Sequence, residues 1–166
     1  MMKLSLAGLT TLAVAVATVG VALVNPSPAA AQAPEQQWFM ELDGVPHGKI
    51  WTRSSGHSQC LTANTFAIAT APCGSSTPGQ YWFMEFEGVP HGKIWTRSNG
   101  HSQCLTADPN TSAIATAPCG NSTPGQYWFM EFEGVPQGKI WTRSNGHSQC
   151  LTADPNTSAV TTAPCG

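Results

Sequence analysis

Residues 81–120 read YWFMEFEGVPHGKIWTRSNGHSQCLTADPNTSAIATAPCG, and residues 127–166 repeat these 40 positions with changes only at Gln137, Val160 and Thr161. A third copy begins at Gln37, with further substitutions and two residues fewer. Self-similarity at such a period is the signature of an architecture built from repeated supersecondary units. The repeats cover about residues 37–80, 81–126 and 127–166.

Each repeat holds four short strand candidates separated by turn residues. In the second repeat these strands are expected over residues 82–87, 93–97, 103–107 and 112–117. In the first of them, Trp82, Met84 and Phe86 share one face, which is the period of two typical of a half-buried strand. No segment of the repeats has helical periodicity. The sequence therefore predicts an all-β fold of twelve strands.

The two ends of the repeat region are expected to fit together. The first repeat begins with a strand at Gln36-Gln37-Trp38, and the sequence stops at Cys165-Gly166, before a fourth such strand. We expect the N-terminal strand to complete the third repeat and close a ring, which removes the exposed sheet edges that promote aggregation. A solenoid would have atypical repeats at its ends, whereas these repeats are alike.

Six cysteines follow residue 31, and no Cys-x-x-Cys spacing occurs among them. In an exported chain, an even number of cysteines predicts disulfides rather than a metal or redox site. Within a repeat the first cysteine begins one strand and the second follows the next strand, so an antiparallel hairpin would place them side by side at its open end. We therefore expect the bonds Cys60–Cys73, Cys104–Cys119 and Cys150–Cys165.

The first 31 residues differ from the repeats. Lys3 precedes a small and apolar run from Leu4 to Val24, and Ala29-Ala30-Ala31 has the small residues that a signal peptidase recognises. We predict a secretory signal peptide over residues 1–31, a mature domain over residues 32–166 and an extracellular location. The alternative is a retained membrane anchor, because the run is long enough to span a bilayer; the prolines and alanines after it favour removal.

Composition argues against several function classes. The mature domain has six basic and nine acidic residues, so nothing in its charge suggests nucleic acid or an anionic membrane as a partner. Catalysis is not expected, because an active site needs different groups converging on one place and nearly every polar residue occurs in triplicate. His57, His101 and His147 could meet on a threefold axis to bind a metal, but turn histidines are more often exposed. We expect a monomer with no metal and no cofactor.

Two sequence patterns recur in the repeats and carry a family resemblance. One is Gln-x-Trp, found at residues 36–38, 80–82 and 126–128; the other is Gly-x-x-x-Cys-Leu-Thr followed by a strand that ends in Pro-Cys. Together they resemble the signature of ricin B-type lectins, and the whole looks most like the short secreted actinobacterial members. The resemblance covers residues 36–166. It implies a β-trefoil, with three pseudo-threefold repeats of four short strands, and a non-catalytic carbohydrate-binding module for a glycan or polysaccharide.

The usual sugar-site residues of that family are absent from all three repeats. The family carries an aspartate two residues after the first cysteine, an aromatic residue two before the second cysteine, and an asparagine before the Gln-x-Trp glutamine. At these positions the sequence has Thr62, Thr106 and Thr152, then Ala71, Ala117 and Ala163, and finally Glu35, Gly79 and Gly125. The fold therefore carries over from the family better than the sugar site does.

Two patches could still bind a sugar, and we prefer the hairpin pocket of the second repeat. The family builds its sites there, and Asp108 in the Asp108-Pro109-Asn110 turn can partly replace the absent aspartate. The expected residues are Thr106, Asp108, Asn110 and Gln126, with equivalents Thr152, Asp154, Asn156 and Gln36 across the ring closure. Repeat one, which has Asn64-Thr65 in this turn, is expected to contribute little.

The other patch is formed by Trp95 and Trp141. If Ile94 and Ile140 point inward, alternation turns these tryptophans outward, where a sugar could stack on them. The alternative is that each ring packs against the neighbouring hairpin, with Lys or Arg over it.

Two other function classes remain open beside the lectin. One is a secreted β-trefoil that binds protein, such as a protease inhibitor or a toxin-like adhesion factor. Its signature would be a non-repeated loop with unique residues, and the turn over residues 64–66 is the one candidate. The other is a stable scaffold with no sugar ligand.

Overall fold

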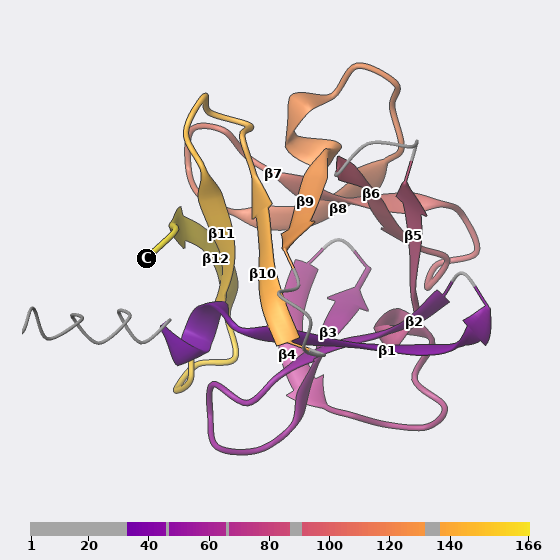
Figure 1. Cartoon of the computed structure of the whole chain (residues 1–166). Coiled ribbons are helices and arrows are strands. Elements are labelled where there is room, and N and C mark those ends of the chain that lie inside the picture. The colour runs from indigo at the N-terminus through magenta and orange to yellow at the C-terminus, as the bar shows by residue number, and fades with distance from the viewer. Residues whose placement is uncertain (1–32, 46, 66, 87–90, 132–136) are drawn as a thin grey trace, which may run out of the picture.

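The computed structural model of the protein describes residues 33–45, 47–65, 67–86, 91–131 and 137–166 (Figure 1). The predicted signal peptide, Phe66 and Glu87 lie outside these residues. Within them, twelve strands form one sheet, as predicted. The strands are β1 (Trp38–Val45), β2 (His47–Thr52), β3 (Gln59–Asn64), β4 (Ala67–Pro72), β5 (Trp82–Phe86), β6 (His91–Thr96), β7 (Gln103–Ala107), β8 (Ile114–Pro118), β9 (Trp128–Glu131), β10 (Gln137–Thr142), β11 (Gln149–Ala153) and β12 (Val160–Pro164).

Three short 3-10 turns precede the tryptophan strands. They are η1 (Pro34–Gln36), η2 (Pro78–Gln80) and η3 (Pro124–Gln126). No helical turn was expected there, and Gln36, which was expected to begin a strand, lies in the first of them. Each of the three turns begins with proline, whose fixed φ suits the first position of such a turn. None of the helical segments in the described part of the chain is long and apolar enough to cross a membrane.

Six of the strands close into a barrel by antiparallel pairing. The order around it is β1, β2, β5, β6, β9 and β10. The last contact of the ring joins β10 to β1, with Trp38 opposite Gly138 and Phe39 opposite Gln137. The predicted closure by the N-terminal strand is therefore confirmed.

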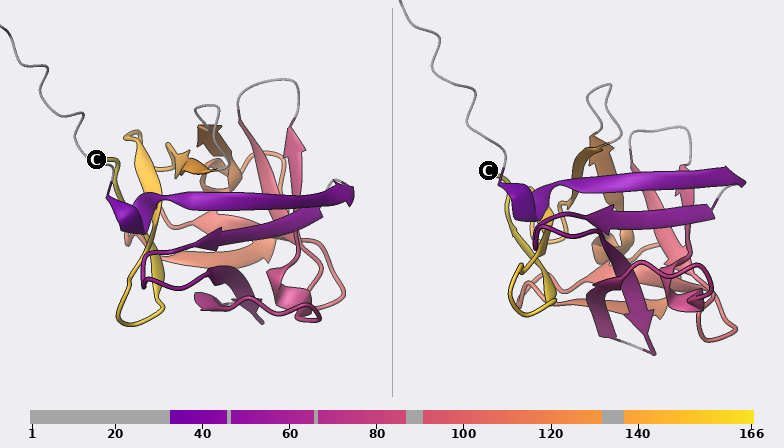
Figure 2. Two further views of the ribbon diagram at one scale, coloured as in Figure 1. Left: turned by 60° about the horizontal axis from the view of Figure 1, so that its bottom comes forward. Right: turned by 90° about the horizontal axis from the view of Figure 1, so that it is seen from below.

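The other six strands form three hairpins, β3–β4, β7–β8 and β11–β12, which contact one another. In both views of Figure 2 the β3–β4 hairpin lies below the β1–β2 hairpin. The hairpins are joined from repeat to repeat by backbone bonds. Thr70 N–H donates to Ser158 O at 2.8 Å, and Thr162 N–H donates to Ser112 O at 2.9 Å.

The core consists of groups of three equivalent residues, one from each repeat. Trp38, Trp82 and Trp128 are fully buried, and each indole Nε1–H donates to a leucine carbonyl at 2.8–2.9 Å. The other fully buried groups are Ile50, Ile94 and Ile140, and Leu61, Leu105 and Leu151. This confirms that the isoleucines point inward.

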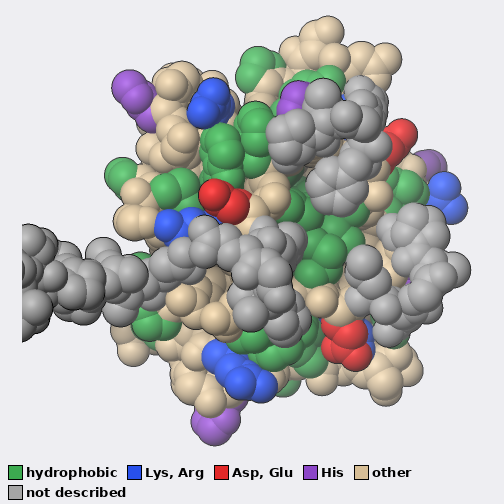
Figure 3. Space-filling view, viewed as in Figure 1, with side chains coloured by type: hydrophobic (Ala, Val, Ile, Leu, Met, Phe, Trp, Pro, Cys, Tyr) green, Lys and Arg blue, Asp and Glu red, His purple; other side chains and the backbone are tan. Residues whose placement is uncertain are grey.

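All three expected disulfides are present, each with a Cα–Cα distance of 5.0 Å. Each joins a fully buried first cysteine, such as Cys104, to a second cysteine in the loop after the hairpin. On the face drawn in Figure 3, the Lys and Arg side chains of the described residues lie at separate points, interspersed with acidic and apolar groups.

Candidate functional site

A cavity of about 450 Å³ lies beside the β7–β8 hairpin. Its apolar lining comes from the alanines of the hairpin and from two prolines, and its polar lining comes from three turns and a strand. The polar side chains are Thr106, Asp108, Thr123 and Ser144, and the apolar ones are Ala107, Pro109, Ala113, Ala115, Ala117 and Pro124. A volume of this size suits a small ligand, and sites for such ligands join apolar surface to a few fixed polar groups.

Asp108 contributes the carboxylate of this cavity. Its Oδ1 accepts hydrogen bonds from the backbone N–H groups of Asn110 at 2.7 Å and Thr111 at 3.2 Å, which fixes the turn. Oδ2 has no hydrogen-bond partner among the described residues, so it is free to accept from a ligand. Asp154 repeats the turn, and the N–H groups of Asn156 and Thr157 hold the pKa of its carboxyl below the ordinary value of 3.8.

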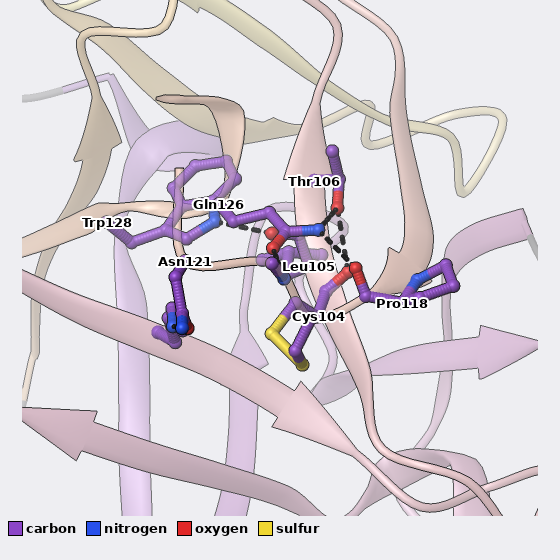
Figure 4. The surroundings of a disulfide bond; sticks show 10 residues. Cys104, Leu105, Thr106, Pro118, Asn121, Gln126 and Trp128 are labelled. Atoms are coloured by element: carbon purple, nitrogen blue, oxygen red, sulfur yellow. Dashed lines mark hydrogen bonds between the residues drawn. A yellow bond between two sulfur atoms is a disulfide. The ribbon is translucent and has the colours of Figure 1, made fainter. Parts of the chain in front are cut away.

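Gln126 is not part of the lining of this cavity. Figure 4 shows its side-chain amide directed toward Thr106 and Pro118. The residue is 1% exposed, and its Nε2 donates to Thr106 Oγ1 at 3.1 Å and to Pro118 O at 3.0 Å. Its Oε1 accepts from Gly120 N–H at 2.8 Å. Thr106 Oγ1 in turn donates to Cys104 O. This amide therefore links η3, the hairpin and the disulfide loop, and its bonds are used within the protein.

This arrangement of a Gln-x-Trp turn against a disulfide-bonded hairpin recurs in all three repeats of the chain. Residues 46–166 match the family model of the ricin-type β-trefoil lectin domain. The chain belongs to this family.

Two solved structures of low sequence identity have a similar fold. Cytolethal distending toxin from Actinobacillus actinomycetemcomitans matches with a TM-score of 0.54 and 17% identity, over 80% of this chain and 82% of that chain. The Haemophilus ducreyi toxin matches with a TM-score of 0.54 and 18% identity, over 83% of this chain and 77% of that chain. No curated protein matches the sequence.

Gly125 stands where the ricin-type family carries asparagine, and its surroundings leave no room for a side chain. A Cβ at this position would lie 2.1 Å from Ala107 O, and one at Gly79 would lie 2.3 Å from Ala63 O. Because these oxygens belong to the backbone, they could make room for a Cβ only if the whole strand moved. The family's asparagine is therefore excluded by the close approach of η2 and η3 to their hairpins.

We expect Gln126→Leu to destabilise the domain by about 2–4 kcal/mol, because it removes the three hydrogen bonds of a buried amide. The measurement is urea unfolding followed by circular dichroism. Gln103→Leu is the matched control: Gln103 is also buried, but its Oε1 has no hydrogen-bond partner, so the same substitution should change stability by less than about 1 kcal/mol. Equal effects of the two substitutions would contradict a structural role for the Gln126 amide.

The equivalent site of the third repeat is assembled across the ring closure. Gln36 Nε2 donates to Thr152 Oγ1 at 3.4 Å and to Pro164 O at 2.9 Å, and its Oε1 accepts from Gly166 N–H at 3.2 Å. The structure thus brings Gln36 and Thr152 together. Repeat one keeps the same glutamine contacts through Gln80, but it has no aspartate in the turn.

Trp95 and Trp141 lie half-buried on the outer face of the barrel. Trp95 stacks on Phe83 with ring centroids 4.1 Å apart, and Trp141 stacks on Phe129 at 4.0 Å. An arginine lies over each tryptophan at 5.2 Å. The expected arginine over each ring is therefore present, but each ring packs on the partner strand of its own hairpin rather than on the neighbouring hairpin. Part of each ring is already covered.

Sequence reasoning missed two polar residues of the cavity, Thr123 and Ser144, and included two residues that lie elsewhere. Ser144 enters the lining from the turn after β10, in the next repeat, whereas Asn110 and Gln126 are not in the lining. No signal within a single repeat identifies Ser144, because its position depends on how repeats pack. His57, His101 and His147 are exposed, and no metal-binding group of three His, Cys, Asp or Glu residues occurs in the described part of the chain.

Proposed function

We propose that the protein is an exported, non-catalytic carbohydrate-binding module that holds a neutral saccharide in the β7–β8 cavity. The observation that carries the proposal is the cavity itself, in which Asp108 and Thr106 adjoin an apolar floor. Membership of the ricin-type family supports it, since that family model describes a lectin domain. The Asp108 carboxylate favours a ligand rich in hydroxyl donors and disfavours an anionic one.

The polar groups of the cavity are suited to sugar hydroxyls. Asp108 Oδ2 is an open acceptor, and the hydroxyls of Ser144 and Thr123 can both donate and accept. Ala117 replaces the aromatic residue on which the family stacks a sugar ring, so each site is expected to bind weakly. A polysaccharide that engages the site of Asp108 and the site of Asp154 together would be retained through multivalency.

The proposal also includes that the protein is monomeric and secreted, and that it resembles the small actinobacterial members of the family. Three disulfides suit an oxidising compartment, and the segment over residues 1–31 would direct export. The partners are glycans or polysaccharides, with no nucleic acid and no membrane after cleavage of the signal peptide.

We expect Asp108→Asn combined with Asp154→Asn to reduce retention on a neutral polysaccharide by at least about tenfold, because the charged acceptor is lost from both sites. Asparagine keeps an oxygen that can accept from the turn N–H groups, so the fold is retained. The measurement is affinity electrophoresis on gels containing xylan, chitin fragments or galactan. The control is Asn64→Ala, in the turn of repeat one that lacks the aspartate, and it should leave retention unchanged.

Two experimental outcomes would contradict the proposal. Absence of retention on all neutral polymers, and of binding at millimolar monosaccharide, would overturn a sugar-binding function for the cavity. If Trp95→Ala with Trp141→Ala removes retention in a folded protein while the aspartate pair does not, the sugar binds on the outer face instead.

A further inference from the structure

A row of aromatic rings crosses the seam between the first and second repeats on the outer face of the barrel. His47 of β2 lies opposite Phe83 of β5, with ring centroids 5.1 Å apart and planes at 28°. Phe83 in turn stacks on Trp95 of β6 at 4.1 Å and 9°. Tyr81 flanks the row, 6.0 Å from His47. The pairing of strands from different repeats creates this row, so it is a feature of the assembled barrel.

Cationic groups lie over these rings. The Arg97 guanidinium is 5.7 Å from the centroid of Phe83 and 5.2 Å from that of Trp95, and Lys49 Nζ is 5.6 Å from the centroid of Tyr81. Cation–π contact fixes the position of the guanidinium without using its N–H groups. Arg97 donates no hydrogen bond to any residue that the structure describes. Its donors are therefore held in place and available.

A hollow of about 470 Å³ opens at this seam. Its lining consists of His47, Pro78, Tyr81, Phe83 and Arg97. None of these lining residues is a carboxylate. Glu85, two residues from Phe83 on β5, lies opposite Lys93 in the β5–β6 register, and no ion pair joins a carboxylate to Arg97 among the described residues. The equivalent Glu131 lies opposite Lys139 and shares the lining of a neighbouring hollow with Arg143. The hollow at the first seam combines apolar ring surface with a fork of N–H donors, which matches a ligand that has both an apolar face and a carboxylate.

The second seam repeats the arrangement, and the third seam differs in its sequence. His91 lies 5.1 Å from Phe129 and 5.7 Å from Tyr127, and Arg143 lies 5.8 Å from the Phe129 ring. At the third seam Phe39 lies opposite Gln137, and Gln37 stands at the tyrosine position. The chain thus contains two seams that carry both histidine and tyrosine, and a third seam that carries glutamine at both positions.

We propose that the two His–Tyr seams bind acidic saccharides, with a uronate carboxylate on Arg97 or Arg143 and the sugar ring against the tyrosine and proline. Bidentate N–H donation gives a guanidinium its preference for carboxylate. Two such seams on one barrel allow a uronic acid polymer to engage both. The inference rests on the proposed function in that the ligand is a saccharide, but it uses different residues from the β7–β8 cavity and an anionic rather than a neutral ligand.

The test uses the full secreted chain, with polygalacturonate fragments and their fully methyl-esterified form as probes in titration calorimetry. Esterification keeps the sugar and removes the charge. We expect binding to the acid form and at least about tenfold weaker binding to the ester. Arg97→Gln with Arg143→Gln should weaken binding of the acid form by at least about tenfold, whereas Arg53→Gln, at the third seam, should leave it unchanged.

A second variant removes the rings without risk to the fold. His47→Gln with His91→Gln gives both seams the residue that the third seam already carries as Gln137, and we expect several-fold weaker binding of the acid form. Equal binding of acid and ester, or an effect of Arg53→Gln as large as that of the other two arginines, would overturn the inference.

The two proposals can fail separately. Retention on a neutral polymer that depends on the aspartate pair, without binding of polygalacturonate, would overturn the seam sites and leave the proposed function standing. Binding of polygalacturonate alone, sensitive to Arg97 and Arg143, would support the seams and overturn the cavity as the sugar site.

Discussion

Reduction of the three disulfides is expected to unfold the domain at about 37 °C. The bonds close loops with sequence separations of 13, 15 and 15 residues, and loops of this size contribute about 3 kcal/mol each in the chain-entropy model. Their sum of about 9 kcal/mol is comparable with the total stability of a typical domain, about 5–15 kcal/mol. The reduced protein should therefore have little or no stability left.

The measurement is circular dichroism and tryptophan fluorescence of protein reduced in urea and diluted into buffer with dithiothreitol. Dilution without the reductant is the control for refolding. Removal of a single bond by Cys104→Ala with Cys119→Ala should cost about 3 kcal/mol and leave a cooperative urea transition. A reduced protein with the same urea midpoint as the oxidised one would show that the core alone is sufficient.

Much of the fold could be predicted because each strand pattern and each cysteine pair occurs in all three repeats. A single Trp82-Phe83-Met84 alternation would be a weak strand signal, but the same alternation at Trp38 and Trp128 gives it a fixed place in a threefold structure. The cysteine pairing follows in the same way, because Cys104 and Cys119 recur at equivalent places in each repeat. The 3-10 turns escaped prediction because three residues are too few for any periodicity.

The candidate site was predictable only where its residues share one hairpin. Thr106 and Asp108 follow Cys104 on the same strand and turn, so their proximity is local. Gln126 was expected to contact a ligand, but sequence cannot tell whether an amide faces a ligand or buried backbone groups. Ser144 and the His47–Phe83 row depend on the register between strands of different repeats, which the sequence of one repeat does not determine.

Trp38→Ala is expected to destabilise the domain by about 3–5 kcal/mol, the range for truncation of a large buried aromatic residue. Trp38 is fully buried, and its Nε1–H donates at 2.8 Å to Leu151 O, which is 113 residues away in the sequence. The substitution removes this bond and leaves a cavity where β1 meets β10. The measurement is urea unfolding of the oxidised protein.

Comparison with Trp128→Ala makes this a test of ring closure. Trp128 is equally buried and donates to Leu105 O at 2.9 Å within the continuous part of the chain. If the N-terminal strand completes the barrel, the two substitutions should cost the same to within about 1 kcal/mol, because the two sites are equivalent by pseudo-symmetry. Trp95→Ala, on the outer face, should cost less than either, since its ring is only half-buried. A small loss for Trp38→Ala beside a full loss for Trp128→Ala would mean that the barrel is stable without its N-terminal strand, and that the third repeat does not need the first to close it.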